Sequence, residues 1–309
     1  MAVKPNNIFV DSILYVVVGV TIGSVMAFAA GSFLWAAASI NTFSKTAETF
    51  IDGELPRLVP AFFLLGSAGL ILILRRALGI KRFHSPRETI AAVQSEKPLD
   101  IKGGLGSTLA ALIAVGGGAS VGQYGPLVHF GGTVGAAVAK AVKTRIPGET
   151  WIGCGVAGAI AAGFGVPLAA IVFSHEVVLR RFSISAIAPI SICAITAAML
   201  SDQFQVGGRP YFDGLVHSLT MEFIPLLILS APVFAITAVL FMALLGKLID
   251  KVDQLPNLPA WPLILAALLC AFVGLWVPGA LGLGIDVVQD FLSNSLPVAA
   301  VLILIVAKL

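Results

Sequence analysis

The sequence predicts an all-α protein that crosses a membrane several times. Three observations carry this prediction. Hydrophobic residues make up 58% of the 309 residues, charged residues make up 11%, and the mean hydropathy is +1.00. The apolar residues gather in long runs, and one glycine-rich segment interrupts them. Because a soluble core of ordinary composition cannot bury this much apolar surface, we expect a polytopic membrane protein.

Nine apolar runs predict the helices in order along the chain. They lie near residues 12–40, 58–78, 105–121, 126–142, 151–174, 184–200, 223–246, 261–285 and 296–307. The runs give about seven to nine helices, and several are shorter than the 20 or so residues that a transmembrane helix needs. The first run does not have the pattern of a cleaved signal peptide, so it is counted as part of the structure.

The runs 105–121 and 126–142 meet at a glycine-rich turn instead of a charged loop. This arrangement predicts discontinuous helices that end inside the bilayer, as in secondary transporters. Unwound backbone survives at membrane depth only where it lines a cavity, because hydrocarbon offers no hydrogen-bond partner to a free N–H or C=O. The segment between these two runs is therefore the first candidate for a functional site.

Residues 116–135, GGGASVGQYGPLVHFGGTVG, hold eight glycines and one proline. Pro126 suits the first turn of a helix, and the preceding residues Gly122, Gln123, Tyr124 and Gly125 are expected to form a sharp turn. Free amides at a helix start, together with the positive end of the helix dipole, favour an anion. The sequence thus predicts an anion pathway at residues 122–126.

A packing role for some of these glycines remains open. Gly131 and Gly135 have the spacing of a small-xxx-small surface, on which helices approach closely. Packing alone would explain these two glycines and Gly132. It does not explain a proline, so it accounts less well for the turn before Pro126.

Charge predicts the orientation in the membrane. Residues 75–102 carry seven Lys or Arg against three acids, whereas residues 44–57 carry two against three, and residues 201–222 are net acidic. By the positive-inside rule the 75–102 segment is a cytoplasmic loop, and Lys140, Lys143, Arg145, Arg180 and Arg181 mark further cytoplasmic ends. The net charge of +3 is thereby explained by topology, and nucleic acid is not an expected partner.

Two stretches echo each other two hundred residues apart, LPRLVPAFFLLGSAGL from Leu55 and LPNLPAWPLILAALLCAFVGL from Leu255. Weak internal symmetry of this kind is typical of inverted-repeat transporters.

The three cysteines, Cys154, Cys193 and Cys270, stand in apolar segments without metal-ligand spacing, so we expect neither a disulfide nor a metal site. No cofactor is expected.

The motifs resemble the CLC family of chloride channels and proton-coupled chloride transporters. The family pattern G-[RK]-E-G-P is similar to Gly122–Pro126, followed by Gly131 and Gly132. A second family helix start resembles GVPLAAIVFSHEV, residues 165–177, and the loop KRFHSPRETIAAV, residues 81–93, stands where the family carries G-S-G-I-P-E.

The resemblance implies an all-helical fold of two inverted (antiparallel) repeats with discontinuous helices, assembled as a homodimer with one anion pathway per subunit. The first repeat would cover residues 1–200, a connecting loop 201–220, and the start of the second repeat 221–309. The family's later G-x-F-x-P helix start and its late tyrosine have no counterpart here. We therefore expect a second repeat that is incomplete in this chain.

Tyr124 stands where the family carries its gating glutamate. A phenol, with an ordinary pKa of about 10, can donate a hydrogen bond to an anion but cannot shuttle protons as a carboxylate does. The resemblance therefore implies a passive, channel-like pathway at this position. An aromatic residue anchored at the membrane interface is the alternative explanation.

The resemblance assigns further candidate residues. The family's second proton-relay glutamate falls on Val177, beside Glu176 and His175, which are possible proton or polar relays. His129 is a further candidate relay because it is a histidine within a membrane segment, and an interhelical hydrogen bond would explain it at least as well. A solvated or ion-paired helix end would also explain Glu176. The family's chloride-binding serine falls on Phe83, beside His84, Ser85 and Pro86, which form a possible anion-coordinating loop. Loop polarity alone would explain these residues too.

The leading functional hypothesis is passive transport of chloride or a similar small monovalent anion through the lipid bilayer, in the bacterial plasma (inner) membrane. A proton-coupled antiporter with other proton carriers, and a fragment that does not transport, remain alternatives. An enzyme is not expected, because the sequence shows no catalytic grouping in its apolar segments, and no catalytic residues are assigned.

Overall fold

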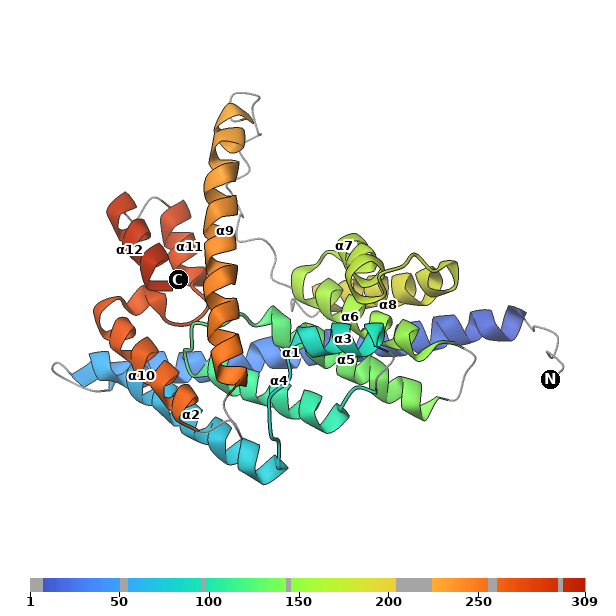
Figure 1. Cartoon of the computed structure of the whole chain (residues 1–309), viewed down its shortest axis with the longest axis horizontal. Helices are drawn as coiled ribbons and strands as arrows, with labels where there is room; N and C mark the ends of the chain where they lie inside the picture. The colour runs from blue at the N-terminus through green and yellow to red at the C-terminus, as the bar shows by residue number, and fades with distance from the viewer. Residues whose placement is uncertain are drawn as a thin grey trace.

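The computed structural model describes residues 8–50, 55–95, 98–142, 146–203, 224–254, 260–293 and 297–308. Within these ranges the protein is all-helical and has no β-strand, which confirms the predicted fold class (Figure 1). The helices, in order, are α1 (Ile8–Thr49), η1 (Leu55–Leu58), α2 (Val59–Leu78), α3 (Pro86–Gln94), α4 (Ile101–Gly116), α5 (Tyr124–Ala141), α6 (Gly148–Phe164), α7 (Pro167–Phe173), η2 (Ser174–Val178), α8 (Ile184–Gln203), α9 (Ile224–Asp253), α10 (Trp261–Trp276), η4 (Pro278–Ala280), α11 (Ile285–Leu292) and α12 (Val298–Lys308).

Some predicted boundaries were wrong. The run 151–174 is divided between α6 and α7, because Gly165 adopts the left-handed region with φ of 69° and Pro167 starts a new helix. The run 261–285 ends as a helix at Trp276, two residues before Pro278. The 75–102 segment, expected as a loop, contains the helix α3.

The main core surrounds α6, which packs against α5, α8 and α1. Small side chains dominate this core. Gly23 of α1 comes so close to α8 that a Cβ there would lie 2.6 Å from the Cys193 carbonyl oxygen. Cys154 and Cys193 are both buried free thiols, and Cys193 Sγ donates to the Cys154 carbonyl oxygen at 2.9 Å. Close helix approach, more than large side chains, holds this part of the fold together.

The expected packing role of the glycines on α5 is confirmed for Gly131 and Gly135. A Cβ on Gly131 would lie 2.2 Å from the Gly155 carbonyl oxygen, and one on Gly135 would lie 2.2 Å from the Trp151 carbonyl oxygen. Both glycines therefore let α5 lie directly on the backbone of α6. Gly132 faces a different neighbour, the Thr89 side chain of α3.

A second, smaller core joins α2 and α10, which lie side by side at one end of the molecule (Figure 1). Leu64 and Ala68 of α2 are buried against Ala267 and Ala271 of α10. These two helices contain the echoing stretches of the sequence, so the two segments that resemble each other also contact each other. The division into repeats itself stays a prediction.

Four described helices are long and apolar enough to cross a membrane, namely Ser12–Thr49, Pro56–Leu78, Ile184–Gln203 and Ile224–Val252. The 16 residues of α4, at 1.5 Å per residue, span roughly 24 Å and fall short of the hydrocarbon thickness. Helix α9 runs roughly perpendicular to α1 in the view of Figure 1. Almost all of its described side chains are exposed. Lys143 and Arg145, nearly all of the predicted loop 201–220, and residues 255–259 of the second echoing stretch lie outside the described residues.

Candidate functional site

The glycine-rich break joins α4 to α5. Helix α4 ends at Gly116, Gly118 takes the left-handed region with φ of 89°, and α5 begins at Tyr124. The turn is thus formed by residues 117–123. The prediction that Tyr124 and Gly125 lie in the turn was wrong, because both belong to the first turn of α5. Pro126 lies in the first turn of α5, where its missing N–H breaks no helical hydrogen bond.

Tyr124 packs on the end of α6. Its ring centroid is 4.0 Å from that of Phe164, and the ring also covers Gly163, where a Cβ would lie 2.9 Å from Tyr124 Cδ1. The preceding residue, Gln123, is buried. The phenol hydroxyl has no hydrogen-bond partner among the residues that the structure describes. The ring is therefore held by packing, and its hydroxyl remains available to a ligand.

A cavity of about 780 Å³ opens beside Tyr124. Most of its wall comes from three places in the sequence, namely the C-terminal half of α1, the glycine turn, and the turn before α11. The lining includes Asn41, Thr42, Lys45, Glu48, Gly116, Gly117, Gly118, Gln123, Tyr124, Gly279, Gly282 and Gly284. The last two places are tied together, because Gly282 N–H donates to the Gly118 carbonyl oxygen at 2.8 Å. Apolar side chains, among them Leu34, Val115 and Leu281, line this space together with the glycine backbone and the polar side chains.

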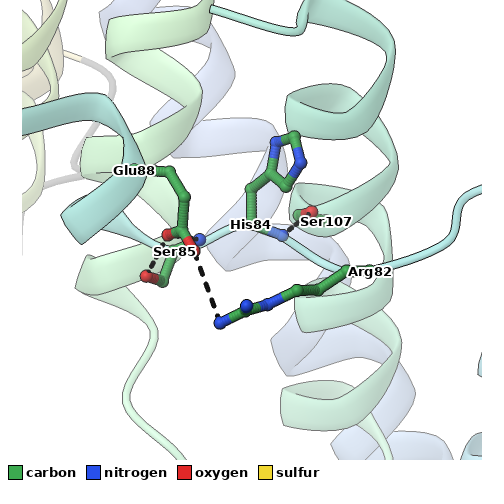
Figure 2. Close-up of polar contacts among 5 residues, drawn as sticks. All are labelled: Arg82, His84, Ser85, Glu88 and Ser107. Carbon is green, nitrogen blue, oxygen red and sulfur yellow. Dashed lines mark hydrogen bonds and ion pairs between the residues drawn. The ribbon is translucent and has the colours of Figure 1, made fainter. Parts of the chain in front are cut away.

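The candidate loop before α3 is organised by Glu88. The Ser85 N–H donates to Glu88 Oε2 at 2.7 Å, and the Ser85 hydroxyl donates to the same oxygen (Figure 2). Arg82 lies 3.9 Å from the other carboxylate oxygen. This capping box starts α3. The Ser85 proton is therefore engaged, and an anion at this hydroxyl would have to displace a carboxylate.

The pKa of the Glu88 carboxyl lies below its ordinary value. Partial burial acts to raise this pKa, but the hydrogen bonds from Ser85 and the charge of Arg82 lower it by more. Glu88 is consequently ionised when it accepts the bonds that cap α3.

His84 connects this loop to α4 and α5. Its main-chain N–H donates to Ser107 Oγ at 2.7 Å (Figure 2). The Ser107 hydroxyl in turn donates to the Gly103 carbonyl oxygen at 2.7 Å. The imidazole lies over Gly103, where a Cβ would be 2.5 Å from His84 Cε1. Its ring meets that of His129 edge to face, with centroids 5.9 Å apart. A side chain on Gly103 would thus remove the His84 ring from this position.

His129 is buried, with 1% of its surface exposed. Its Nδ1 lies 2.6 Å from Thr89 Oγ1, and its Nε2 has no partner. His84 Nδ1 is also buried without a partner. Pro86 adjoins Gly125, because a Cβ on Gly125 would lie 3.7 Å from Pro86 Cγ. The predicted loop 83–86 and the start of α5 are therefore neighbours, and the two helices α3 and α5 begin close together.

The third group of candidates lies on a single π-helical turn, η2, which the sequence did not predict. His175 is fully buried, and its Nδ1 is 2.9 Å from the Ile171 carbonyl oxygen. Because a carbonyl oxygen can only accept, Nδ1 carries the proton, and the buried, unpartnered Nε2 holds a lone pair. The ring stacks on Phe182 with centroids 5.4 Å apart. Turns of this type are frequent at functional sites.

Glu176 is exposed, as a solvated helix end would be. Arg181, one of its expected ion-pair partners, pairs with Glu149 of α6 instead. The neighbouring Arg180 takes a positive φ of 52°, which turns the chain away from η2.

Helix α3 links the two groups of histidines. It begins beside His84, and its last residue, Gln94, donates through Nε2 to the Val177 carbonyl oxygen of η2 at 3.4 Å.

The sequence S-P-R-E at residues 85–88 is a helix-start signal that could have revealed α3. Thr89 was missed because it is 40 residues from its partner His129. Within the described ranges, no group of three or more His, Cys, Asp or Glu side chains is placed to hold a metal ion.

Comparison with known proteins gives a consistent result. The family model described as voltage gated chloride channel matches residues 70–309. The voltage-gated ClC-type chloride channel ClcB of Escherichia coli O17:K52:H18 is 27% identical over 233 residues, which cover 74% of this chain and 54% of the relative. ClcB from Escherichia coli O81 matches to the same extent. The chain thus spans about half the length of the curated relatives it matches.

Solved structures share the fold. A slow cyanobacterial Cl⁻/H⁺ antiporter superposes with a TM-score of 0.80 at 17% identity, over 95% of this chain and 71% of that protein. A CLC-type fluoride/proton antiporter superposes with a TM-score of 0.70 at 19% identity, over 99% of this chain and 77% of the other. At these identities the likeness concerns the fold alone.

Proposed function

Because the chain belongs to the voltage-gated chloride channel family, we propose that it passes chloride or another small monovalent anion through a membrane without coupled proton movement. The anion pathway would run past the start of α5, with residues Gly122, Gln123, Tyr124, Gly125 and Pro126 at its narrow part. The E. coli relatives favour the bacterial inner membrane as its location. A homodimer is the expected assembly, and its mass in detergent would test this.

The position of Tyr124 carries the proposal. Its side chain borders the 780 Å³ cavity at the first residue of α5, where the family resemblance puts a gating glutamate. A tyrosine can narrow the pathway and donate a hydrogen bond to an anion, but it lacks the carboxylate that competes with the anion and carries the proton. Passive permeation follows from that difference.

Charge and backbone dipoles support an anion at this place. The helix start supplies the positive end of the α5 dipole, and the glycines of the turn let main-chain N–H groups approach a ligand. Lys45 lines the cavity wall, which also includes Glu48. Lys81, Arg82 and Arg87 precede or begin α3 and would concentrate anions near the predicted cytoplasmic side.

A second candidate, a proton-coupled antiporter, is favoured by His175. Its buried Nε2 holds an unpartnered lone pair, which is a proton acceptor, and exposed Glu176 stands next to it. Both solved structures that share the fold are named as proton antiporters. In this alternative a proton would travel through His175 and Glu176 instead of through residue 124.

Anion efflux from proteoliposomes with external pH recorded in parallel tests the two candidates. The full chain should release chloride without proton uptake, and Tyr124→Glu should slow the efflux or couple it to protons. Tyr124→Phe is the matched control, because it keeps the ring packed on Phe164 and should stay uncoupled. Stoichiometric proton movement in the wild type, abolished by His175→Gln, would establish the antiporter instead. Efflux equal to that of protein-free liposomes would overturn both.

A further inference from the structure

We propose that the His129 imidazole is a ligand of the permeating anion, with its Nε2–H donating a hydrogen bond to the ion next to the starts of α3 and α5. The inference rests on the proposed anion pathway, since it assigns one of the ligands of that pathway. It gives His129 a role different from the proton relay considered from the sequence.

Hydrogen-bond accounting fixes the tautomer of His129. The His129 ring is the only hydrogen-bond partner of the Thr89 hydroxyl within the described part of the chain, at 2.6 Å from Nδ1. If the Thr89 hydroxyl donates to Nδ1, its proton has an acceptor, and only the Nε2–H is without a hydrogen-bond partner. If Nδ1 donated to the Thr89 oxygen instead, both the hydroxyl proton and the Nε2 lone pair would be without a hydrogen-bond partner. Since each buried unpaired polar group destabilises the fold, the first arrangement holds.

The result is a buried N–H donor that lacks an acceptor. His129 is 1% exposed, and its Nε2 contacts no acceptor among the residues that the structure describes. Such a donor calls for a bound acceptor, which in an anion pathway is the anion itself. A metal ion is a poor fit, because Nε2 carries a proton in this tautomer and a metal needs the lone pair of the nitrogen.

Neighbouring elements direct further positive character to the same place. His129 lies four residues after Gly125 on α5, and Gly125 adjoins Pro86 at the start of α3, so two helix N-termini converge beside it. The His84 and His129 rings meet edge to face, and His84 Nδ1 is buried without a partner among the described residues.

The bare backbone of three glycines makes room for this arrangement. Gly103 accepts the His84 ring, Gly132 accepts the Thr89 methyl group at 2.3 Å from a hypothetical Cβ, and Gly104 accepts Thr133. The charged groups around the pair are Glu88 and Arg82 on one side and Asp100, the N-cap of α4, on the other. The Glu88 carboxylate is engaged by Ser85 and Arg82, which leaves the His129 donor directed at a ligand.

His175 provides an internal comparison. Its Nδ1 donates to the Ile171 carbonyl oxygen, so its Nε2 is an acceptor, the reverse of His129. Both rings are buried and both have an unpartnered Nε2. An anion should therefore perturb His129 and leave His175 unchanged.

Nitrogen NMR of ¹⁵N-histidine-labelled full chain in detergent micelles tests the assignment directly. The chain has four histidines, so His129→Gln and His175→Gln assign the two resonance pairs. Sodium chloride, bromide or nitrate replaces sodium gluconate at constant ionic strength. We expect His129 to show protonated Nε2 and a saturable shift of that nitrogen, and His175 to show protonated Nδ1 and no shift.

Thr89 supplies the matched variants. Thr89→Val keeps the shape and removes the hydroxyl, so the tautomer is no longer fixed and anion affinity should fall roughly two- to tenfold, the equivalent of one hydrogen bond. Thr89→Ser keeps the hydroxyl and should bind as the wild type does. Protonated Nδ1 on His129, no shift with any of the three anions, or equal affinity in Thr89→Val would overturn the proposal and leave water as the ligand.

The test is independent of transport. A saturable His129 shift in a protein that shows no anion efflux would keep this site and overturn the proposed function. Anion efflux without a His129 shift would overturn the site and keep the pathway.

Discussion

Gly163 controls the place of the Tyr124 ring. A Cβ at this position would lie 2.9 and 3.0 Å from two ring carbons, closer than side chains tolerate. Because the tyrosine side chain can rotate and the α6 backbone cannot, Gly163→Ala should push the ring toward the cavity. We expect anion efflux to fall roughly two- to tenfold, the equivalent of forcing one side chain out of its preferred rotamer.

Combining Gly163→Ala with Tyr124→Ala distinguishes an effect on the Tyr124 ring from an effect on α6. Tyr124→Ala should raise efflux above the wild type, and Gly163→Ala should have no further effect in that background because no ring is left to displace. If Gly163→Ala slows efflux equally in both backgrounds, the change acts through α6 and Tyr124 is not the narrow part of the pathway.

Glu88 makes the stability of α3 depend on pH. Its pKa is lower in the folded chain than in the unfolded one, so the stabilisation is complete above the ordinary pKa of a glutamate and disappears as pH falls through the lowered value. Glu88→Gln keeps a neutral partner for Ser85. The unfolding midpoint of the wild type should exceed that of Glu88→Gln by roughly 1 to 3 °C near neutral pH.

The same comparison at acid pH provides the check. Protonated Glu88 resembles glutamine, so the two thermal midpoints should converge as pH falls below the folded-state pKa. A difference that persists or grows in acid would show that Glu88 stabilises α3 by packing and not by charge.

The position and contacts of a single residue could be predicted only where neighbouring residues in the sequence indicate them. Pro126 in the first turn of α5 follows from its fixed φ, and the candidate Tyr124 follows from a motif. The hydroxyl of Thr89 on His129 could not be predicted, because the two residues are 40 positions apart and meet only through the packing of α3 on α5. The engagement of Ser85 by Glu88 is local, and the S-x-x-E spacing contains it.

The close packing of α5 on α6 depends on glycines, which have no side chain at the contact. Gly131 and Gly155 face each other, and a Cβ on Gly131 would lie 2.2 Å from the Gly155 carbonyl oxygen. Gly131→Ala should therefore force α5 and α6 apart and destabilise the fold by about 1–3 kcal/mol. The thermal unfolding midpoint in detergent measures this.

Gly66 of α2 is the matched control. It is exposed, and a Cβ there would meet nothing within 4 Å. Gly66→Ala should raise the free energy of unfolding by up to about 1 kcal/mol, because alanine loses less backbone entropy in a helix. Equal destabilisation by both substitutions would indicate a general sensitivity of helix glycines and would contradict a specific α5–α6 contact.

Helices with a long apolar run were predictable from hydropathy, and their ends were not. The break between α6 and α7 depends on one left-handed glycine and one proline inside a continuous apolar run. Helix α3 is only nine residues long and mixes polar with apolar residues, so hydropathy overlooked it although its start carries a capping signal. The π-helical turn η2 has no recognisable sequence signature, and its position depends on the packing of Ser174 and His175 into the core.

The chain as a whole distributes its burial unevenly. The α1, α5, α6 and α8 core is dense, whereas α9 has none of its most apolar 18-residue window buried. An isolated apolar helix of 30 residues is sufficient in length to cross a bilayer and needs apolar surroundings along its side. Composition predicted a membrane protein for this reason, while the tertiary position of each span required the structure.

Orientation in the membrane gives a prediction that involves the whole chain. Thr49 and Lys81 are exposed residues on either side of the candidate span Pro56–Leu78, so they should lie on opposite faces. The excess of Lys and Arg in residues 75–102 places Lys81 in the cytoplasm. A membrane-impermeant maleimide should thus label Thr49→Cys in intact spheroplasts and Lys81→Cys only after lysis. Cys270→Ala removes the one native cysteine that is not buried. Labelling of Lys81→Cys alone in intact cells would invert the topology, and labelling of both or neither would mean that α2 does not cross the bilayer.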